Sequence, residues 1–510
     1  MSKKVFFISF RLSFSLFSLR FSRIGCLYGV YMIQYIRISD LGGTFVTLKT
    51  FFGDRAFYKN LARLLIPLTL QQVITNFVSL LDNLMVGSLG TPSISAVAVV
   101  NQLIFILNLA IFGMLSGASI FGAQFFGKRD RDGLRNTFRF KLVSTLALTA
   151  VFIAVLAAFP DELIMPFLKS EANSADDIAL ALEFAREYLS VMLVGLVPFA
   201  IVQIYSGTLK DCGVTLPPMI ASSVAVAVNM TFNYLLIFGK LGFPALGVKG
   251  AAIATVMSRF VEMIYIVIYT HRRLDRFDFL RGIYKSVRIP LDFARRVLVT
   301  GTPLLANEVL WALGTTFINL NYSTRGLDVI AAIQINQTVW QLFCVVMFAM
   351  GSSVSIILGQ KLGTGDTDGA KADSVKLITF TLLLHIGIGL LLVAMSPLVP
   401  LLYNVSDEVR TLVSRLMMIA GASLPIHAFV HVSYFTIRSG GKTLITFLFD
   451  SVYTWCVPVV LSLILCRHTS LTVPMIYFIV QFSDIIKLSI SLPMLKSGFW
   501  ASCVVHEEGK

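Results

Sequence analysis

The sequence predicts an all-α polytopic membrane protein with twelve transmembrane helices in two six-helix bundles. Three observations predict this fold class. The 510 residues are 56% hydrophobic and only 14% charged, with a mean hydropathy of +0.80. A soluble protein of this length cannot bury so much apolar surface. Apolar stretches of about 20 residues, enough to cross a bilayer, recur along the chain, and the second half repeats the first.

The apolar spans alternate with short polar connections. In the first half we expect spans at residues 58–86, 93–123, 142–159, 188–209, 214–238 and 250–270. In the second half we expect them at residues 297–322, 329–358, 377–402, 412–437, 444–466 and 473–495. The predicted domains are a first lobe at 47–271, a basic connection at 272–296, a second lobe at 297–496 and a tail at 497–510.

Charge in the connections predicts the orientation. Basic loops follow spans two, six, eight and ten, and residues 271–296 alone carry eight Lys and Arg residues. An acidic connection follows span three. Because cytoplasmic loops carry an excess of Lys and Arg, we expect these basic loops and both termini in the cytoplasm. The predicted location is the cell membrane, plasma or inner, crossed many times.

The N-terminal segment 1–46 does not fit this pattern. It is rich in Phe, Ser and Arg, and its longest charge-free run, 24–36, is too short to span a membrane. Three interpretations stay open: a translated upstream stretch from a mis-assigned start, an amphipathic arm on the membrane surface, or a targeting segment.

The two halves align at a nearly constant offset. Pro67 corresponds to Pro303 and Gly90 to Gly326, both 236 residues apart, and AVAVVNQ (96–102) corresponds to AAIQINQ (331–337). Six spans per half is an even number, so both repeats have the same orientation. They are therefore expected to be related by a pseudo-two-fold axis along the membrane normal. Two facing bundles suit a transporter that works by alternating access.

Asp82 is the one acidic residue in the first span. A charge inside the bilayer costs about 2.5–3.5 kcal/mol on insertion scales, so we expect Asp82 to have a function. Its counterpart in the second half is Ile318, whereas Glu308 lies earlier in span seven. The two lobes thus share a backbone plan but differ in their charges.

Several motifs together resemble the multidrug and toxic compound extrusion (MATE) transporters. They are LDNLMVGSLGT (81–91) with NQ ten residues on, GAQFFGKRD (122–130), its counterpart GQKLGTGD (359–366), NMTFNYLLIFG (229–239) and GVKGAAIAT (247–255). The resemblance covers about residues 49–500. It implies a secondary active exporter of organic, often cationic, compounds in exchange for H⁺ or Na⁺. It also implies that Asp82, Asn229 and Asn233 bind the coupling ion and that Glu308 has a role in the second lobe.

The chemistry of these residues suits that role. Burial disfavours the charged form of a carboxylate, so an aspartate can bind a proton and release it when it becomes exposed, or it can supply oxygen ligands to Na⁺. Asn229 and Asn233 are four residues apart and share one helix face. Their amides could complete a cation shell or donate hydrogen bonds to Asp82. The alternatives are a polar clamp for Asp82 and interhelical hydrogen bonds for the asparagines.

The roles of the remaining polar residues in the spans stay open between a functional and a structural interpretation. Glu308 could meet substrate charge, carry protons or pair with a neighbouring amide. His427 and His431, one turn apart on span ten, could relay protons or pack as satisfied polar groups. We expect Arg259 with Glu262 and Asp484 with Lys487 to form ion pairs at the i,i+3 spacing. Asp450 is expected to meet Lys442 or Arg438, and His385 to pack in the core.

Other function classes find no support in the sequence. It holds no Walker A motif, nucleophile elbow or H-E-x-x-H motif, and its six cysteines show no metal spacing. We therefore expect no enzyme, catalytic residue, metal site or nucleic-acid partner, and no cofactor apart from H⁺ or Na⁺. The expected partners are a small-molecule substrate and the bilayer, with a monomeric chain. The rivals are a lipid-linked precursor flippase of the same wider superfamily and, more distantly, a membrane receptor or enzyme.

Overall fold

The computed structural model describes residues 48–168 and 175–505. The chain divides into two compact units, 1–53 and 54–510, and α2 (Leu48–Phe51) is the described helix of the first. The atypical segment 1–46 lies outside the described residues. The rest of this description concerns the second unit, whose described residues form helices joined by loops, with no strand among them.

Twelve helices among the described residues are long and apolar enough to cross a membrane, which confirms the predicted fold class. The short helix α6 (Pro160–Leu168) lies in the acidic connection. The six spans of the first half are α3 (Arg55–Gly87), α4 (Thr91–Lys128), α5 (Arg131–Ala158), α7 (Ala175–Asp211), α8 (Leu216–Phe238) and α9 (Gly247–His271).

The second half repeats this order. Its first four spans are α10 (Leu291–Ser323), α11 (Leu327–Gly363), α12 (Thr367–Met395) and α13 (Asp407–Ser439). Span eleven consists of α14 (Thr443–Phe447), the π-helical turns η5 (Leu448–Val452) and η6 (Trp455–Val459), and α15 (Val460–His468). Span twelve consists of α16 (Val473–Phe482) and α17 (Ile485–Ser497).

The helix ends differ from the prediction at several places. Helix α5 begins at Arg131 and not near residue 142, and α7 begins at Ala175 and not near residue 188, because their polar first turns are helical as well. Proline accounts for two further differences. The ninth helix ends at Met395 and not near residue 402, because Pro397 disfavours helix in the residue before it; the 3₁₀ turn η4 (Val399–Leu402) follows. Conversely, α10 begins at Leu291, directly after Pro290, so the basic connection is shorter than expected. Two 3₁₀ turns, η2 (Asp278–Leu280) and η3 (Ile283–Lys285), lie within that connection.

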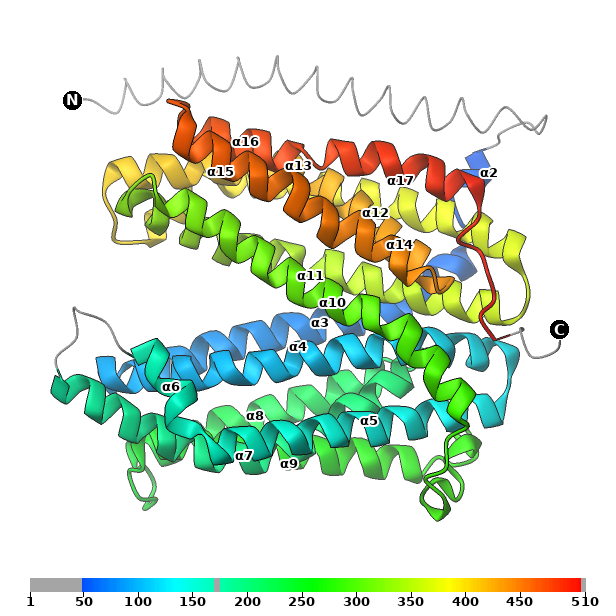
Figure 1. Cartoon of the computed structure of the whole chain (residues 1–510), viewed down its shortest axis with the longest axis horizontal. Coiled ribbons are helices and arrows are strands. Elements are labelled where there is room, and N and C mark those ends of the chain that lie inside the picture. Colours follow the sequence, from blue (N-terminus) through cyan, green and yellow to red (C-terminus); the bar gives the residue numbers. More distant parts are fainter. Residues whose placement is uncertain (1–47, 169–174, 506–510) are drawn as a thin grey trace. The chain divides into compact units, whose positions relative to one another are not determined.

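The helices form two lobes, with α3–α9 in one and α11–α17 in the other (Figure 1). Helix α10 runs obliquely from the first lobe to the second. Phe293 and Val297 in its first turns belong to the apolar core of the first lobe, whereas Tyr322 at its far end belongs to a core of the second lobe. One continuous helix therefore links the two cores.

The lobes meet at the end that carries the basic loops, and they do so with near symmetry. The Nε2 of Gln360 donates to the carbonyl of Asp211 at 2.7 Å, and the Nε2 of Gln124 donates to the carbonyl of Ser439 at 2.9 Å. A Cβ added to Gly127 would overlap the carbonyl oxygen of Gln360. The 236-residue repeat thus reappears in space as a pair of matching contacts.

A strap of C-terminal residues, 498–505, crosses the same interface. Ser502 Oγ donates to the carbonyl of Gly440 in the second lobe at 2.7 Å. The amide N–H of Val504 donates to Oε1 of Gln124 in the first lobe at 2.7 Å, and Lys128 Nζ donates to the carbonyl of Val505 at 3.2 Å. Val505 is 3% exposed and joins the core of the first lobe. The strap therefore ties the two lobes together.

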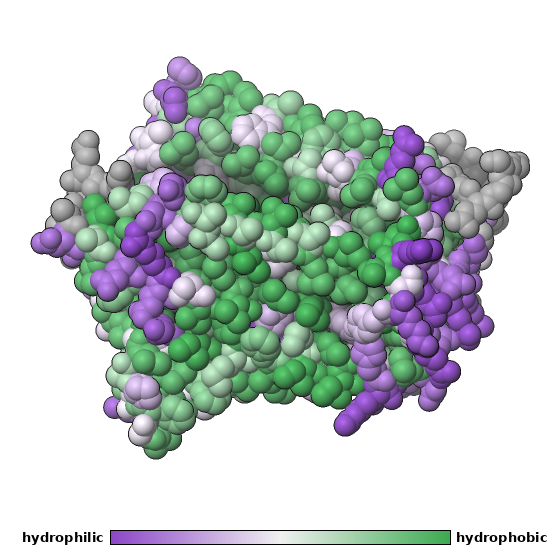
Figure 2. Space-filling model, turned by 60° about the horizontal axis from the view of Figure 1, so that its bottom comes forward, coloured by the Kyte–Doolittle hydropathy of each residue, from purple (hydrophilic) through white to green (hydrophobic). Residues whose placement is uncertain are grey.

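The surface has the pattern of a membrane protein. Figure 2 shows apolar side chains across the middle of the visible face and hydrophilic side chains gathered towards its two ends. Large apolar side chains such as Val151 and Val299, which are 63% and 67% exposed, face outwards. Such exposure is costly in water and favourable in lipid.

Candidate functional site

The first lobe brings together the three residues that the sequence singles out. Asp82 lies near the end of α3, and Asn229 and Asn233 lie one turn apart on α8, 5% and 1% exposed. Asn233 Nδ2 donates to Asp82 Oδ1 at 2.6 Å and lies 3.2 Å from the side-chain amide of Asn229. The predicted cluster therefore exists as a hydrogen-bonded group between two helices.

The side-chain amide of Asn229 faces Asp82 with its nitrogen. This nitrogen lies 2.9 Å and 3.2 Å from the two carboxylate oxygens and donates to them, while the amide oxygen accepts from Thr255 Oγ1 at 3.2 Å. The reverse orientation would place the amide oxygen against the carboxylate oxygens, which repel it.

A second feature of this cluster is an unused acceptor. Among the described residues, the buried Oδ1 of Asn233 has no hydrogen-bond partner. Buried polar atoms are nearly always satisfied, so an exception needs an explanation such as an ion or a water. Asp82 and the two asparagines together offer carboxylate and amide oxygens, the ligands of hard cations.

A chain of polar side chains lies beside the cluster, on α3, α8 and α9. Gln71 Nε2 donates to Ser222 Oγ at 2.8 Å, and Ser222 Oγ donates to Glu262 Oε1 at 2.7 Å. Arg259 Nη1 lies 3.5 Å from Glu262 Oε2, so the expected pair is confirmed. Arg259 also interacts electrostatically with Asp82. Arg259 on α9 is thus engaged with Glu262 and adds positive charge to the surroundings of Asp82.

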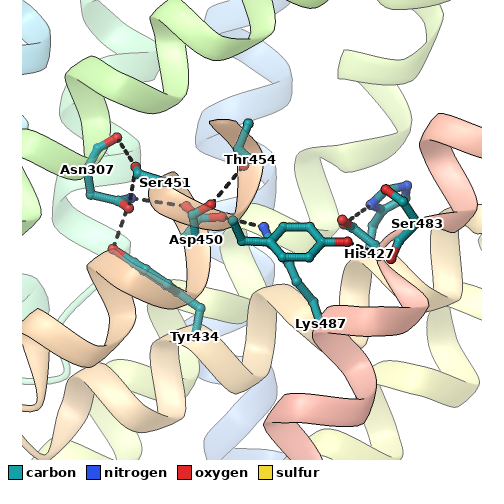
Figure 3. Close-up of polar contacts among 10 residues, drawn as sticks. Asn307, His427, Tyr434, Asp450, Ser451, Thr454, Ser483 and Lys487 are labelled. Carbon is teal, nitrogen blue, oxygen red and sulfur yellow. Dashed lines mark hydrogen bonds and ion pairs between the residues drawn. The ribbon is translucent and has the colours of Figure 1, made fainter. Parts of the chain in front are cut away.

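The second lobe has a different polar network, centred on Asp450 (Figure 3). Lys487 Nζ lies 2.8 Å from Asp450 Oδ1, and Asn307 Nδ2 donates to Asp450 Oδ2 at 3.1 Å. Ser451 Oγ also donates to Asn307 Oδ1, at 2.7 Å. These contacts join α10, span eleven and α17.

Two of the expected ion pairs are wrong. Asp450 meets Lys487 and Asn307, not Lys442 or Arg438, because it lies in the π-helical turn η5, which alters the direction of its side chain. Asp484 does not pair with Lys487, because the helix of span twelve breaks there and Asp484 precedes α17. Asp484 instead lies 3.0 Å from Nδ1 of His427.

The two histidines of α13 occupy separate environments. His427 packs edge-on against Trp340, with ring centroids 5.3 Å apart, and contacts Asp484. His431 packs against Phe348 and Phe435, and its Nε2 has no hydrogen-bond partner among the described residues. Neither histidine is bonded to the other, so the structure does not connect them as a relay. His385 is buried, as expected, and its Nδ1 lies 2.8 Å from the carbonyl of Thr381.

Glu308 lies next to Asn307 but outside this hydrogen-bonded network. It is half-buried on α10 and interacts electrostatically with Arg438 and Asp450. Of the second-lobe carboxylates Glu308, Asp450 and Asp484, the last two have cationic or imidazole partners within 3.0 Å. The charges of this lobe are largely neutralised by its own side chains.

Sequence reasoning missed two buried ion pairs. Lys141, placed in a basic loop, is fully buried in α5 and lies 2.5 Å from Asp211. Lys487 and Asp450 come from different spans, 37 residues apart. A charge inside an apolar helix costs free energy, so each of these residues could have been expected to have a buried partner. The partner itself cannot be identified from the sequence.

Comparison with known proteins defines the family. A family model described as MatE matches residues 67–235 and 303–465, one segment in each repeat. The chain belongs to the MATE family. This confirms the resemblance in the motifs, and MATE proteins are transporters and not enzymes.

Curated relatives of this MATE protein agree. The "Probable multidrug resistance protein NorM" of Thermotoga maritima is 26% identical over 314 residues, 61% of this chain and 64% of that protein. The chain thus spans a little under two thirds of NorM. The "Probable multidrug resistance protein YoeA" of Bacillus subtilis is 24% identical over 421 residues, 82% of this chain and 88% of that protein.

Solved structures share the fold. A crystal structure of MATE in complex with MaL6 has a TM-score of 0.76 and 19% identity, covering 89% of this chain and 98% of that one. An outward-facing conformation of a multidrug resistance MATE family transporter of the MOP superfamily has a TM-score of 0.74 and 19% identity, covering 89% and 99%. The MATE fold therefore applies to nearly the whole described chain.

One prediction concerns the Asp450–Lys487 pair. Replacing Lys487 with Met leaves a carboxylate without its cation in a site where the lysine side chain is 6% exposed. Removing one partner of a buried pair lowers the free energy of unfolding by about 3–5 kcal/mol. We expect thermal unfolding of the detergent-solubilised Lys487→Met variant at a clearly lower temperature, and recovery of most of the loss in Lys487→Met/Asp450→Asn. A single variant that unfolds like the wild type would show that the pair is not needed.

Proposed function

We propose that this chain is a secondary active efflux transporter that exports organic, mainly cationic, compounds in exchange for H⁺ or Na⁺. The observation that carries the proposal is the cluster of Asp82, Asn229 and Asn233, where a carboxylate and two buried amides meet inside an apolar bundle. Relatives named as multidrug resistance proteins support a broad range of organic substrates.

The geometry supplies a way for the ion to be sensed. With Asp82 charged, the amide nitrogens of both asparagines face its oxygens and compensate its charge. When a proton or Na⁺ binds, it neutralises the charge that these donors compensate. The hydrogen bonds between α3 and α8 therefore differ between the two states of the site.

The inter-lobe contacts support alternating access. Those of Gln124, Gln360 and the strap all lie at the end of the basic loops, which we place in the cytoplasm together with both termini. A ligand that alters the first lobe can shift transport only if it binds one arrangement of the lobes better than the other. We propose that the ion at Asp82 and the substrate each bind more tightly to a different arrangement of the lobes.

Gradient-driven efflux from vesicles tests the function. The full chain is reconstituted with a fluorescent organic cation inside, and either an inward H⁺ gradient or an inward Na⁺ gradient is imposed. We expect efflux with one of the two gradients and none with an equal K⁺ gradient, and the effective ion identifies the coupling ion. Equal dye release under all three gradients would contradict coupled export.

A lipid-linked precursor flippase of the same wider superfamily is the second candidate. Such a protein needs cationic side chains to meet phosphate in its central cavity. Among the described residues, the buried cations Lys141 and Lys487 are paired with Asp211 and Asp450, which leaves Arg438 as a buried cation without an ion pair. The described charges favour the export of organic cations.

A further inference from the structure

The outer side of the first lobe contains an apolar groove near the basic end of the bundle. Its volume is about 640 Å³, within the range of about 300–1,000 Å³ that is usual for small-molecule sites. Leu142 and Leu146 of α5, Ile201 of α7, and Met263 and Val267 of α9 form its walls. None of the described residues that line it is charged. A cationic substrate would find no counter-charge there, whereas a hydrocarbon chain would fit its walls.

One end of the groove is polar. Tyr205 of α7 and Tyr284 of the basic connection line that end, and their hydroxyls are hydrogen-bonded to each other. The Tyr205 hydroxyl also lies 2.9 Å from Nε2 of His271, the last residue of α9. The groove therefore runs from apolar walls to hydroxyl and imidazole groups, the same polarity order as a lipid from its acyl chain to its headgroup.

The connection at this polar end is both apolar and basic. Tyr284 and Val287 are 59% and 62% exposed, and they alternate with the exposed cations Lys285 and Arg288. Such a mixture is typical of a segment at the membrane interface. The guanidinium of Arg139 donates to the carbonyl of Ile283 at 3.4 Å, which fixes the connection over α5.

Lys285 and Arg288 have no ion-pair partner in the described parts of the chain. The carboxylates of the same connection are engaged elsewhere, because Asp278 lies 2.6 Å from Arg131 and Asp275 lies 2.8 Å from Arg281. Two uncompensated cations thus stand beside the polar end of the groove. Basic sites of this kind on the cytoplasmic side of membrane proteins bind anionic lipid headgroups.

We propose that this groove binds an anionic phospholipid of the leaflet that faces the basic connection. One acyl chain lies between α5 and α9, over α7, and the phosphate meets Lys285 and Arg288. Charge complementarity and the order of apolar and polar groups along the groove favour this occupant over a zwitterionic lipid or an organic cation. The site is separate from the Asp82 cluster and does not depend on the proposed transport function.

Native mass spectrometry of the full chain in detergent tests the proposal. Phosphatidylglycerol and phosphatidylcholine are added in turn at equal concentration, and the fraction of protein that retains one lipid is measured. We expect the wild type to retain phosphatidylglycerol several-fold more than phosphatidylcholine. Equal retention of the two lipids would overturn the proposal.

Two variants locate the lipid. Lys285→Glu/Arg288→Glu is expected to abolish the preference for phosphatidylglycerol, while Lys442→Glu/Lys496→Glu, which makes the same charge change in the second lobe, retains it. Ile264→Trp fills the groove from α9 at a position that is 50% exposed, and it is expected to lower retention of both lipids. Undiminished retention in both groove variants, or an equal loss in the second-lobe control, would overturn the assignment. All the side chains changed on the connection are exposed, so folding should be preserved.

Discussion

Asp82→Asn should abolish ion-driven efflux while leaving the protein folded. The substitution removes the only acidic group of the cluster but keeps its size, and an amide cannot bind a proton or neutralise Na⁺ as a carboxylate does. Under the gradient that drives the wild type, we expect the rate of dye efflux from vesicles to equal the passive leak. Binding of the organic cation is expected to persist, because the change removes the ion-binding carboxylate and keeps the size of the side chain.

The neighbouring amides should give a graded effect. Asn233→Ala removes the donor that lies 2.6 Å from Asp82 Oδ1 together with a buried, unused acceptor. Loss of a residue that supports an ion ligand typically weakens ion affinity by about 10–100-fold, so the ion concentration for half-maximal efflux should rise by that order.

The matched control for Asp82→Asn is Asp328→Asn, which makes the same change at an exposed site on α11 and should transport normally. Undiminished gradient-driven efflux by Asp82→Asn would contradict the assignment of Asp82 as the residue that binds the coupling ion.

Gly363→Ala should prevent the lobes from closing at the end of the basic loops. An added Cβ would overlap the carbonyl oxygen of Gln124, a backbone atom that cannot rotate away. Overpacking in a well-packed site costs about 1–3 kcal/mol, and here the strain is relieved only by separating the lobes. We expect a shift towards the arrangement that is open at this end, with slow transport.

The reactivity of Cys212 can report this shift. Cys212 is 4% exposed and lies in the turn that Gln360 contacts through the carbonyl of Asp211. A polar thiol reagent should label Cys212 faster in Gly363→Ala than in the wild type. Gly387→Ala is the control, because an added Cβ there meets nothing within 4 Å. Equal labelling rates in the two alanine variants would rule out the expected opening.

Much of the fold was predictable because the bilayer imposes a simple rule on sequence. Every span must be apolar over about 20 residues, so all twelve were found, and the repeat gave their common plan. The ends were less accurate at Pro397 and Pro290, and at the polar first turns of α5 and α7, which extend beyond the apolar spans. The cluster of Asp82 with Asn229 and Asn233 was predictable because a family motif fixed its members.

The second lobe shows where sequence reasoning fails. The i,i+3 rule for Asp484 and Lys487 assumes an unbroken helix, but the helix of span twelve is interrupted before Ile485. The π-helical turn that holds Asp450 likewise has no clear signature in the sequence. The sequence places Lys141 in a basic loop. Only its packing against α7 shows that it is buried with Asp211.

The strap has a practical consequence for anyone who purifies this protein. Val505 is inserted into the first lobe, and the residues before it are hydrogen-bonded to both lobes. An affinity tag or a fluorescent protein fused at the C-terminus therefore starts within a few residues of the interface between the lobes and can disturb it. Such preparations should contain more molecules in which the lobes are separated at this interface. Dyes or antibodies selected against them would then favour the separated arrangement.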